Sequence, residues 1–162
     1  MIQEKYNRQI FDEGTEDAII RLSHLRSNVL SPVGIKKGDS VLIIDPDSPA
    51  LVEWMKEQEA SVTEASSEEL AEVKDTFNII ISLGHFNETP ASLKKMLKAD
   101  GRLVYALSQK DRLASFAKKL LSEAGFSQIE SFRVSPDYMF TTEIYAEDYI
   151  GGGAGDCLLI AK

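Results

Sequence analysis

Short runs of hydrophobic residues alternate along the chain with segments of mixed, helical character. Six runs are predicted strands: residues 40–44, 60–63, 77–83, 102–107, 127–134 and 157–161. Residues 40–44 and 77–83 are apolar without alternation, which is typical of strands whose two faces are both covered by helices. The pattern therefore predicts a central sheet with helices on either side of it.

Predicted helices separate most of these strands. They cover residues 15–30, 50–58, 90–98 and 109–124. Thr15 is the expected N-cap of the first helix, whose apolar stripe includes Ile19, Leu22 and Val29. Residues 1–13 show no clear period, and residues 135–156 are poorly defined. The alternation of strand and helix indicates parallel strands joined by right-handed crossovers.

No helix separates the last two predicted strands, so one of them is expected to run antiparallel. The fold class is therefore α/β: a Rossmann-like, mostly parallel sheet with helices on both faces and an antiparallel terminal strand. We expect residues 1–34 to form an N-terminal helical extension and residues 35–162 to form the α/β domain.

Composition narrows the classes of partner. The 162 residues are 43% hydrophobic and carry a net charge of −8, which argues against nucleic acid as a direct partner. Cys157 is the one cysteine, which excludes an intrachain disulfide and a cysteine zinc site, and its apolar strand predicts a buried thiol. The first residues lack the apolar core of a signal peptide, and no apolar run approaches membrane-spanning length. A cytoplasmic protein is expected.

Four stretches carry a resemblance to a known family. Residues 38–44, 77–84, 97–103 and 120–126 resemble the first-strand, fourth-strand, "LKPGG-L" and "L-EAGF" motifs of class I S-adenosylmethionine (SAM) dependent methyltransferases. This resemblance implies a class I methyltransferase fold, here a truncated one. Residues 136–149 are similar to a segment in methyltransferase domains of bacterial proteins linked to surface-polysaccharide assembly.

The resemblance also locates the expected cofactor loop. In that family an acid and a Gly-x-Gly-x-Gly loop follow the first strand, and glycine lets the backbone approach the cofactor closely. The acid falls here at Ile43, and the three glycines fall at Asp45, Asp47 and Pro49. Side chains at these positions fill space meant for the ligand, prolines remove amide donors, and two carboxylates face the place of the methionine carboxylate. We therefore expect that SAM binding has been lost.

A second anchor differs as well. The family's ribose-binding acid at the end of the second strand falls near Ser66, with Glu64 or Glu68 as possible substitutes, and residues 64–76 are too few for the usual third strand and its helix. If SAM binding is retained, the candidate contacts are Asp45, Asp47, Glu64 and Gly84. SAM is then the cofactor; otherwise none is expected.

His85 is the candidate catalytic residue. It follows the fourth-strand motif, where α/β sheets bind ligands, and an imidazole there can serve as a general base. The sequence identifies no acid to partner it, and a histidine without a catalytic role is the more common outcome. Asp45 and Asp47 also suit a hard cation, although such a pair is more often a solvated turn, so no metal site is predicted.

Two late segments have alternative interpretations. Residues 151–155 are rich in glycine but precede a strand and lack Lys-Ser/Thr, which favours a hairpin connection over a phosphate loop. The aromatic and acidic run from Tyr138 to Tyr149 either packs on the sheet or forms a contact surface for another protein.

Three functional hypotheses follow. The first is a methyltransferase-like domain that does not methylate and acts as a binding or scaffolding protein, as a homodimer or beside an active enzyme of polysaccharide assembly. The second is a divergent SAM-dependent methyltransferase acting on a sugar or other small molecule. The third is a Rossmann-like domain that binds a different small ligand at the same crevice.

Overall fold

A computed structural model describes residues 2–108, 114–146 and 155–162. The helices are α1 (Ile2–Glu13), α2 (Glu16–Leu22), the 3-10 helix η1 (His24–Val33), α3 (Pro49–Glu57), the short 3-10 helix η2 (Leu70–Glu72), α4 (Pro90–Lys94) and α5 (Ala114–Glu123). The strands are β1 (Ser40–Ile44), β2 (Ser61–Ala65), β3 (Phe77–Leu83), β4 (Leu97–Leu107), β5 (Ile129–Ser135), β6 (Glu143–Ala146) and β7 (Asp156–Ala161).

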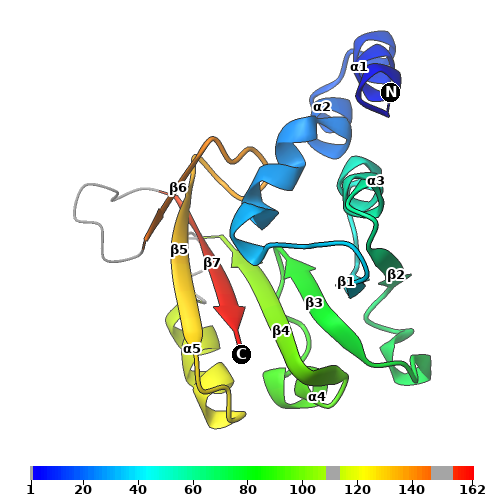
Figure 1. Cartoon of the computed structure of the whole chain (residues 1–162). Helices are drawn as coiled ribbons and strands as arrows, with labels where there is room; N and C mark the ends of the chain where they lie inside the picture. Colours follow the sequence, from blue (N-terminus) through cyan, green and yellow to red (C-terminus); the bar gives the residue numbers. More distant parts are fainter. Residues whose placement is uncertain (1, 109–113, 147–154) are drawn as a thin grey trace.

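The described strands form one seven-stranded sheet in the order β2-β1-β3-β4-β7-β5-β6 (Figure 1). Strands β2, β1, β3 and β4 pair in parallel, whereas β7 pairs antiparallel with both β4 and β5. Strand β5 therefore has the same direction as β4, and only β7 and β6 oppose the rest. The predicted α/β sheet, mostly parallel and with an antiparallel terminal strand, is confirmed.

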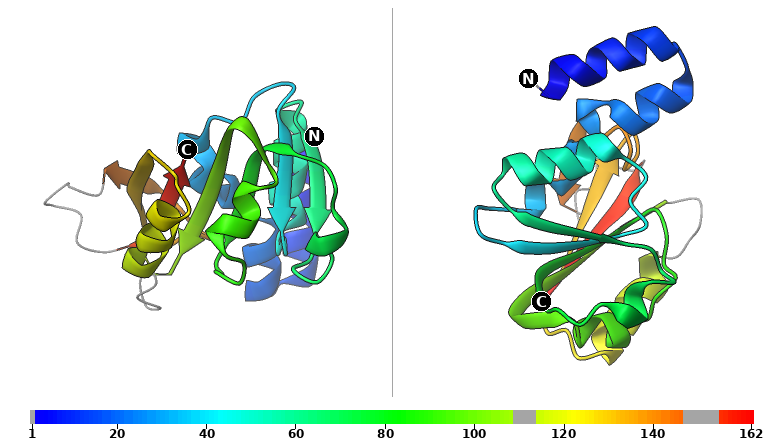
Figure 2. Two further views of the ribbon diagram at one scale, coloured as in Figure 1. Left: turned by 90° about the horizontal axis from the view of Figure 1, so that it is seen from below. Right: turned by 90° about the vertical axis from the view of Figure 1, so that its right-hand side faces the viewer.

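Helices cover both faces of the sheet (Figure 2). Side chains alternate between the faces along each strand: Val41 and Ile43 join the core beneath η1 and α3, and Leu42 and Ile44 join the core on the α4 and α5 side. This explains why apolar residues directed to both faces dominate β1 and β3, whose bounds match the predicted strands. Cys157 is 2% exposed on β7, so the prediction of a buried thiol is also confirmed.

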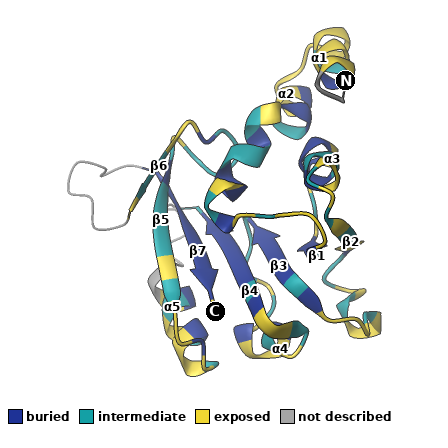
Figure 3. Cartoon of the chain, viewed as in Figure 1, coloured by how far each residue is buried: buried dark blue, intermediate teal, exposed yellow. Residues whose placement is uncertain are grey.

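The first residues form a helix whose bounds the hydrophobic pattern did not predict, within the stretch 1–34 that was expected to be a helical extension. Helix α1 lies on the outer side of α2 (Figure 1), and most of its surface is exposed (Figure 3). Tyr6 is its buried contact, in a small cluster with Ala18 and Leu22 of α2 and Ala50 of α3. Because so little of α1 is buried, its sequence contains few apolar residues.

The predicted helix over residues 15–30 is broken at Ser23. Thr15 caps α2 as expected, since its side chain accepts a hydrogen bond of 3.1 Å from the Ala18 N–H. Ser23 then has extended backbone, and its side chain accepts from the Leu25 N–H to begin η1. The break removes Ile19 from the predicted apolar stripe and leaves it 43% exposed.

Other boundaries differ from the expected ones. Helix α4 ends at Lys94 and β4 begins at Leu97, so the predicted turn at Asp100 and Gly101 lies inside a strand, beside an irregular register between β3 and β4. Strand β6 lies within the stretch that had no prediction. Residues 151–154 of the glycine-rich segment and Tyr149 lie outside the described residues. Between β2 and β3 the chain forms only η2, which leaves β2 at the edge of the sheet.

In the part of the chain that the structure describes, no helix has the length and apolar character needed to cross a membrane.

Candidate functional site

The carboxyl ends of β1 and β3 lie side by side, because Ile44 is in register with Ser82. The two loops that follow, residues 45–48 and 84–87, therefore meet at the carboxyl-terminal end of the parallel strands. Asp45 and Gly84 both have left-handed backbone, with φ of 46° and 81°. For Asp45 this conformation is uncommon and turns the chain sharply at the end of β1. Open α/β sheets bind ligands at this end of their strands.

Asp45 is directed toward the loop after β2. Its carboxylate accepts hydrogen bonds from the N–H and the hydroxyl of Ser67, and its own N–H donates to the carbonyl of Ala65 at the end of β2. Asp45 thus ties the ends of β1 and β2 together.

Asp47 is directed the other way, toward η1. Its Oδ1 lies 2.6 Å from Nη2 of Arg26, whose side chain is only 1% exposed, and Nη1 of Arg26 donates to the carbonyl of Ile20. The sequence had suggested that both carboxylates face one place, that of the methionine carboxylate. That expectation was wrong, because the two carboxylates diverge and Asp47 is neutralised by an arginine 21 residues earlier in the chain.

Ser48 occupies the amino end of α3. Its side chain accepts from the Leu51 N–H at 3.2 Å, and its hydroxyl donates to the carbonyl of Arg21. Pro49 follows and has no N–H to offer. The protein's own serine and proline therefore take up two of the N-terminal positions with which a helix ordinarily binds an anion.

Tyr138 lies over the end of β3. A Cβ added to Gly84 would lie 2.3 Å from the Tyr138 hydroxyl, so glycine is required for the ring to approach the backbone this closely. Burial and the carboxylate of Asp47 raise the pKa of Tyr138, and the nearby Arg26 opposes that shift. Tyr138, Asp47 and Arg26 thus meet above the strand ends on the η1 side of the sheet.

The segment around Tyr138 is held by polar contacts. The Tyr138 N–H donates to Asp156 at 3.0 Å, and Asp137 accepts from the next two N–H groups along the chain. From η1, Asn28 donates to the carbonyl of the buried Thr141 at 2.7 Å. Of the two interpretations of this aromatic segment, packing on the sheet is therefore the one that applies to Tyr138.

His85 lies between β1 and β3. Its Nδ1 is 3.2 Å from the Ser82 hydroxyl, and its Nε2 is 3.3 Å from the carbonyl of Ile44 and 4.0 Å from the carboxylate of Asp45. The structure therefore identifies an acid beside His85 that the sequence did not reveal, because the partner comes from the neighbouring strand. Both ring nitrogens contact protein groups, which positions the ring rigidly at the strand ends.

A small cavity of about 290 Å³ opens on the other side of Asp45, between the ends of β1 and β2. Asp45, Glu64 and Glu69 border it, together with Pro46, Ala65 and Ser66. Hydrogen bonds with Ser66 lower the pKa of the Glu69 carboxyl. Glu64 forms an ion pair of 3.8 Å with Lys56. Of the four candidate SAM contacts, Asp45 and Glu64 share this cavity, whereas Asp47 and Gly84 lie on the Tyr138 side.

Metal ligation has no support among the residues that the structure describes. No group of three or more histidine, cysteine, aspartate or glutamate side chains is arranged there to hold an ion. Asp45 and Asp47, the pair considered for a hard cation, are directed to different partners.

Solved structures share the fold of this chain. A SAM-dependent methyltransferase from Aquifex aeolicus superposes with a TM-score of 0.60 at 10% identity, covering 95% of this chain and 96% of that one. The chain has the class I methyltransferase fold. A SAM-dependent methyltransferase from Thermotoga maritima gives a TM-score of 0.56 at 12% identity over 97% and 98% of the two chains. The sequence itself matches no family model and none of the curated proteins.

A third structure with this methyltransferase fold is a larger enzyme. Phosphoethanolamine N-methyltransferase 1 from Haemonchus contortus, bound to phosphoethanolamine and S-adenosylhomocysteine, gives a TM-score of 0.56 at 11% identity. The match covers 94% of this chain and 44% of that one. At such identities the likeness establishes the fold of this chain and says nothing of its chemistry.

Proposed function

We propose that this domain retains the methyltransferase fold, does not bind SAM, and acts as a binding or scaffolding protein. The observation that carries the proposal is the position of Tyr138. Its ring lies against Gly84, at the strand ends where the family resemblance puts the cofactor, and Asp47 and Arg26 pair beside it.

Displacing Tyr138 to admit a ligand at the ends of β1 and β3 would cost free energy. A ligand over Gly84 would have to displace a half-buried aromatic ring and the segment that Asp137, Asp156 and Asn28 hold in place. Each few kcal/mol spent on such rearrangement lowers affinity by two or more decades. Asp45 adds a carboxylate close to the place of the methionine tail, and Ser48 already caps α3.

Calorimetric titration of the protein with SAM and with S-adenosylhomocysteine tests the proposal. We expect no saturable heat with either compound at submillimolar concentration, while an active methyltransferase run in parallel binds both. Submillimolar binding would contradict the loss of cofactor binding. Tyr138→Ala separates the two obstacles, because binding by this variant alone would assign the block to the ring and not to the loop.

A divergent SAM-dependent methyltransferase acting on a small molecule is the second candidate. The proximity of His85 to Asp45, at 4.0 Å, favours it, because an imidazole held beside a carboxylate is a common arrangement for a general base. The same titration separates the two candidates, since this one requires SAM binding.

A second copy of the chain is the partner that we propose for the scaffolding role. Phe11 on α1 is 85% exposed, and the α1–α2 hairpin stands away from the sheet (Figure 1). An exposed aromatic on a projecting element suits a two-fold contact in which each copy presents the same surface. An enzyme of surface-polysaccharide assembly, suggested by the likeness over residues 136–149, is the alternative partner.

Sedimentation velocity over a range of protein concentrations tests self-association. We expect a concentration-dependent dimer that Phe11→Ser weakens. Phe116→Ser is the matched control, because Phe116 is also exposed, at 54%, but lies on α5 on the opposite face of the sheet. A protein that stays monomeric throughout, or that responds equally to both substitutions, would count against this contact.

A further inference from the structure

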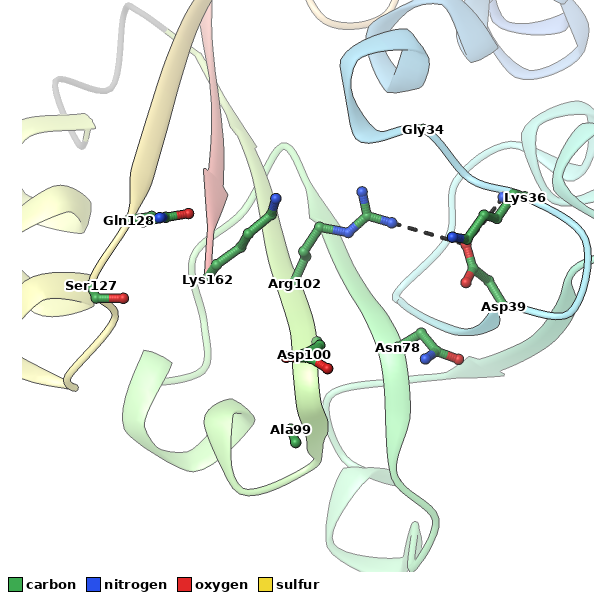
Figure 4. Close-up of a pocket in the computed structure, with 11 residues that line it drawn as sticks. Gly34, Lys36, Asp39, Asn78, Ala99, Asp100, Arg102, Ser127, Gln128 and Lys162 are labelled. Carbon is green, nitrogen blue, oxygen red and sulfur yellow. Dashed lines mark hydrogen bonds and ion pairs between the residues drawn. The ribbon is translucent and has the colours of Figure 1, made fainter.

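A second cavity lies at the opposite end of the strands from the loops that contain Asp45 and Gly84. It has a volume of about 660 Å³, within the range of small-molecule sites, and it opens where β1, β3 and β5 begin and β7 ends (Figure 4). Its lining includes three cationic side chains, Lys36, Arg102 and Lys162, and two anionic ones, Asp39 and Asp100. Among these side chains the cations outnumber the anions by three to two, whereas the chain as a whole has a net charge of −8.

Three nitrogen-bearing side chains stand in a row across the sheet. The register that pairs Leu103 with Ala161 places Arg102 of β4 opposite Lys162 at the end of β7. On the other side, the Lys162 N–H donates to the carbonyl of Gln128 at 2.8 Å. Neighbouring residues on one rung point to the same face. All three side chains line the cavity (Figure 4).

Of these three side chains, Arg102 is held in place by contacts with other parts of the protein. Its guanidinium donates to the carbonyl of Val33 at the end of η1, and its Nη2 lies 3.9 Å from the carboxylate of Asp39. The side chain is 20% exposed, and the Asp39 side chain is 9% exposed. Asp39 also accepts from the N–H of Lys36 at 3.1 Å. The charge of Asp39 is therefore committed to Arg102 and to the loop.

The ammonium groups of Lys162 and Lys36 have no hydrogen-bond or ion-pair partner among the described residues. Nearby lysines differ: Lys37 pairs with Glu59 at 2.7 Å, and Lys98 donates to Asn78. The Arg102 guanidinium is paired with Asp39, so the ammonium of Lys162, which stands beside Arg102 across the sheet, is the charge that a bound anion would neutralise.

We propose that this cavity binds a small organic anion whose phosphate or carboxylate group lies between Lys162 and Arg102. Gln128 extends the row of donors, and the exposed carboxylate of Asp100, which also lines the cavity, suits hydroxyl groups on the rest of the molecule. Glycines at 34 and 101 carry no side chain into the space. The cavity shares no lining residue with the loops around Asp45, Asp47 and Gly84, so the proposal does not depend on whether the protein binds SAM.

Titration followed by backbone amide chemical shifts tests the site with three matched probes: glucose 6-phosphate, glucuronate and glucose. We expect at least one charged sugar to shift amides around residues 101, 128 and 162 in a saturable way, and glucose to do so much more weakly. Lys162→Gln should weaken binding about fivefold, the factor that one charge contact at 4 Å in water supplies. Lys37→Gln, on the same loop as Lys36 but outside the cavity, should leave binding unchanged.

Which sugar binds identifies the anionic group, and either result supports the site. The proposal is wrong if neither charged sugar saturates the wild-type protein at tens of millimolar, if glucose binds as tightly as its charged analogues, or if Lys37→Gln weakens binding as much as Lys162→Gln. Thermal unfolding checks the folding of the variants. Lys162→Gln should unfold near the wild-type temperature, because the Lys162 ammonium has no ion-pair partner among the described residues whose loss would destabilise the fold.

Discussion

The Arg26–Asp47 pair makes an asymmetric prediction about stability. Arg26 is 1% exposed and Asp47 is 48% exposed, although they form one ion pair of 2.6 Å. Removing Asp47 leaves a buried guanidinium without its counter-charge. Removing Arg26 leaves a carboxylate that water can reach. Asp47→Ala should therefore destabilise the protein more than Arg26→Met does.

The magnitudes follow from these environments. A hydrogen bond to a charged group contributes about 1.5–3 kcal/mol, and breaking a fully buried pair costs about 3–5 kcal/mol. Water can partly replace the half-exposed Asp47, so we expect a cost of about 2 kcal/mol for Asp47→Ala. At about 2–4 °C per kcal/mol for a chain of this length, the melting temperature should fall by roughly 4–8 °C.

Arg26→Met should change the free energy of unfolding by no more than about 1 kcal/mol, because it removes the charge that is costly to bury and leaves the unpaired carboxylate of Asp47 where water can reach it. The Arg26 Nε supports this, since it is buried without a hydrogen-bond partner in the described part of the chain. Against this, the substitution removes the hydrogen bond to Ile20. The double variant should resemble Arg26→Met alone.

Urea unfolding measures these free energies, with the fluorescence of the single tryptophan, Trp54, and circular dichroism as independent probes of a two-state transition. Asp47→Asn is the control: it keeps an acceptor but loses the charge, so it should lie between wild type and Asp47→Ala. If Arg26→Met costs as much as Asp47→Ala, or more, the reasoning from their unequal burial is refuted.

Three further predictions concern single positions. Gly84→Ala should lower the free energy of unfolding by about 2–3 kcal/mol, because of the positive φ at this position and the clash with Tyr138. In a Tyr138→Ala background the same substitution should cost about 1–2 kcal/mol. Equal costs in the two backgrounds would contradict the contact between Tyr138 and Gly84. Burial, assisted by Glu53, raises the pKa of Tyr6 to about 12. The stability gained from neutral Tyr6 should therefore be complete below pH ~10 and decline as the pH rises toward 12, and Tyr6→Phe should reduce that decline in urea titrations across this range. Cys157 should react with a thiol reagent only as fast as the protein opens, and rapid labelling under native conditions would be inconsistent with its burial.

The central strands were readable from the sequence for a simple physical reason. Strands β1 and β3 lie between two layers of helix, so apolar residues occupy nearly all of their positions, apart from Ser40, Asn78 and Ser82. The hydrophobic pattern did not predict the bounds of helix α1, because its buried contact is a single residue, Tyr6, that packs on residues of α2 and α3. The break at Ser23 likewise reflects a capping hydrogen bond within an otherwise helical pattern.

The candidate sites divide in the same way. Local sequence located the strand ends and His85, because these are set by positions along one strand and its loop, and the family resemblance assigned Asp45, Asp47 and Pro49 to the expected glycine positions. It could not show that Asp45 faces His85, that Asp47 faces Arg26, or that Tyr138 lies on Gly84. It also placed Arg102 and Lys162 sixty residues apart, although the sheet makes them neighbours.

The amino-acid sequence by itself determined the α/β class, the core strands and the residues at the end of β1, since burial on two faces imposes a pattern that local hydrophobicity reveals. Only the tertiary structure decided which charges are paired, which aromatic ring covers the strand ends and which cations share a cavity. Such contacts depend on distances of a few ångströms between residues far apart in the chain, and these distances exist only after the strands have paired and the helices have packed on them.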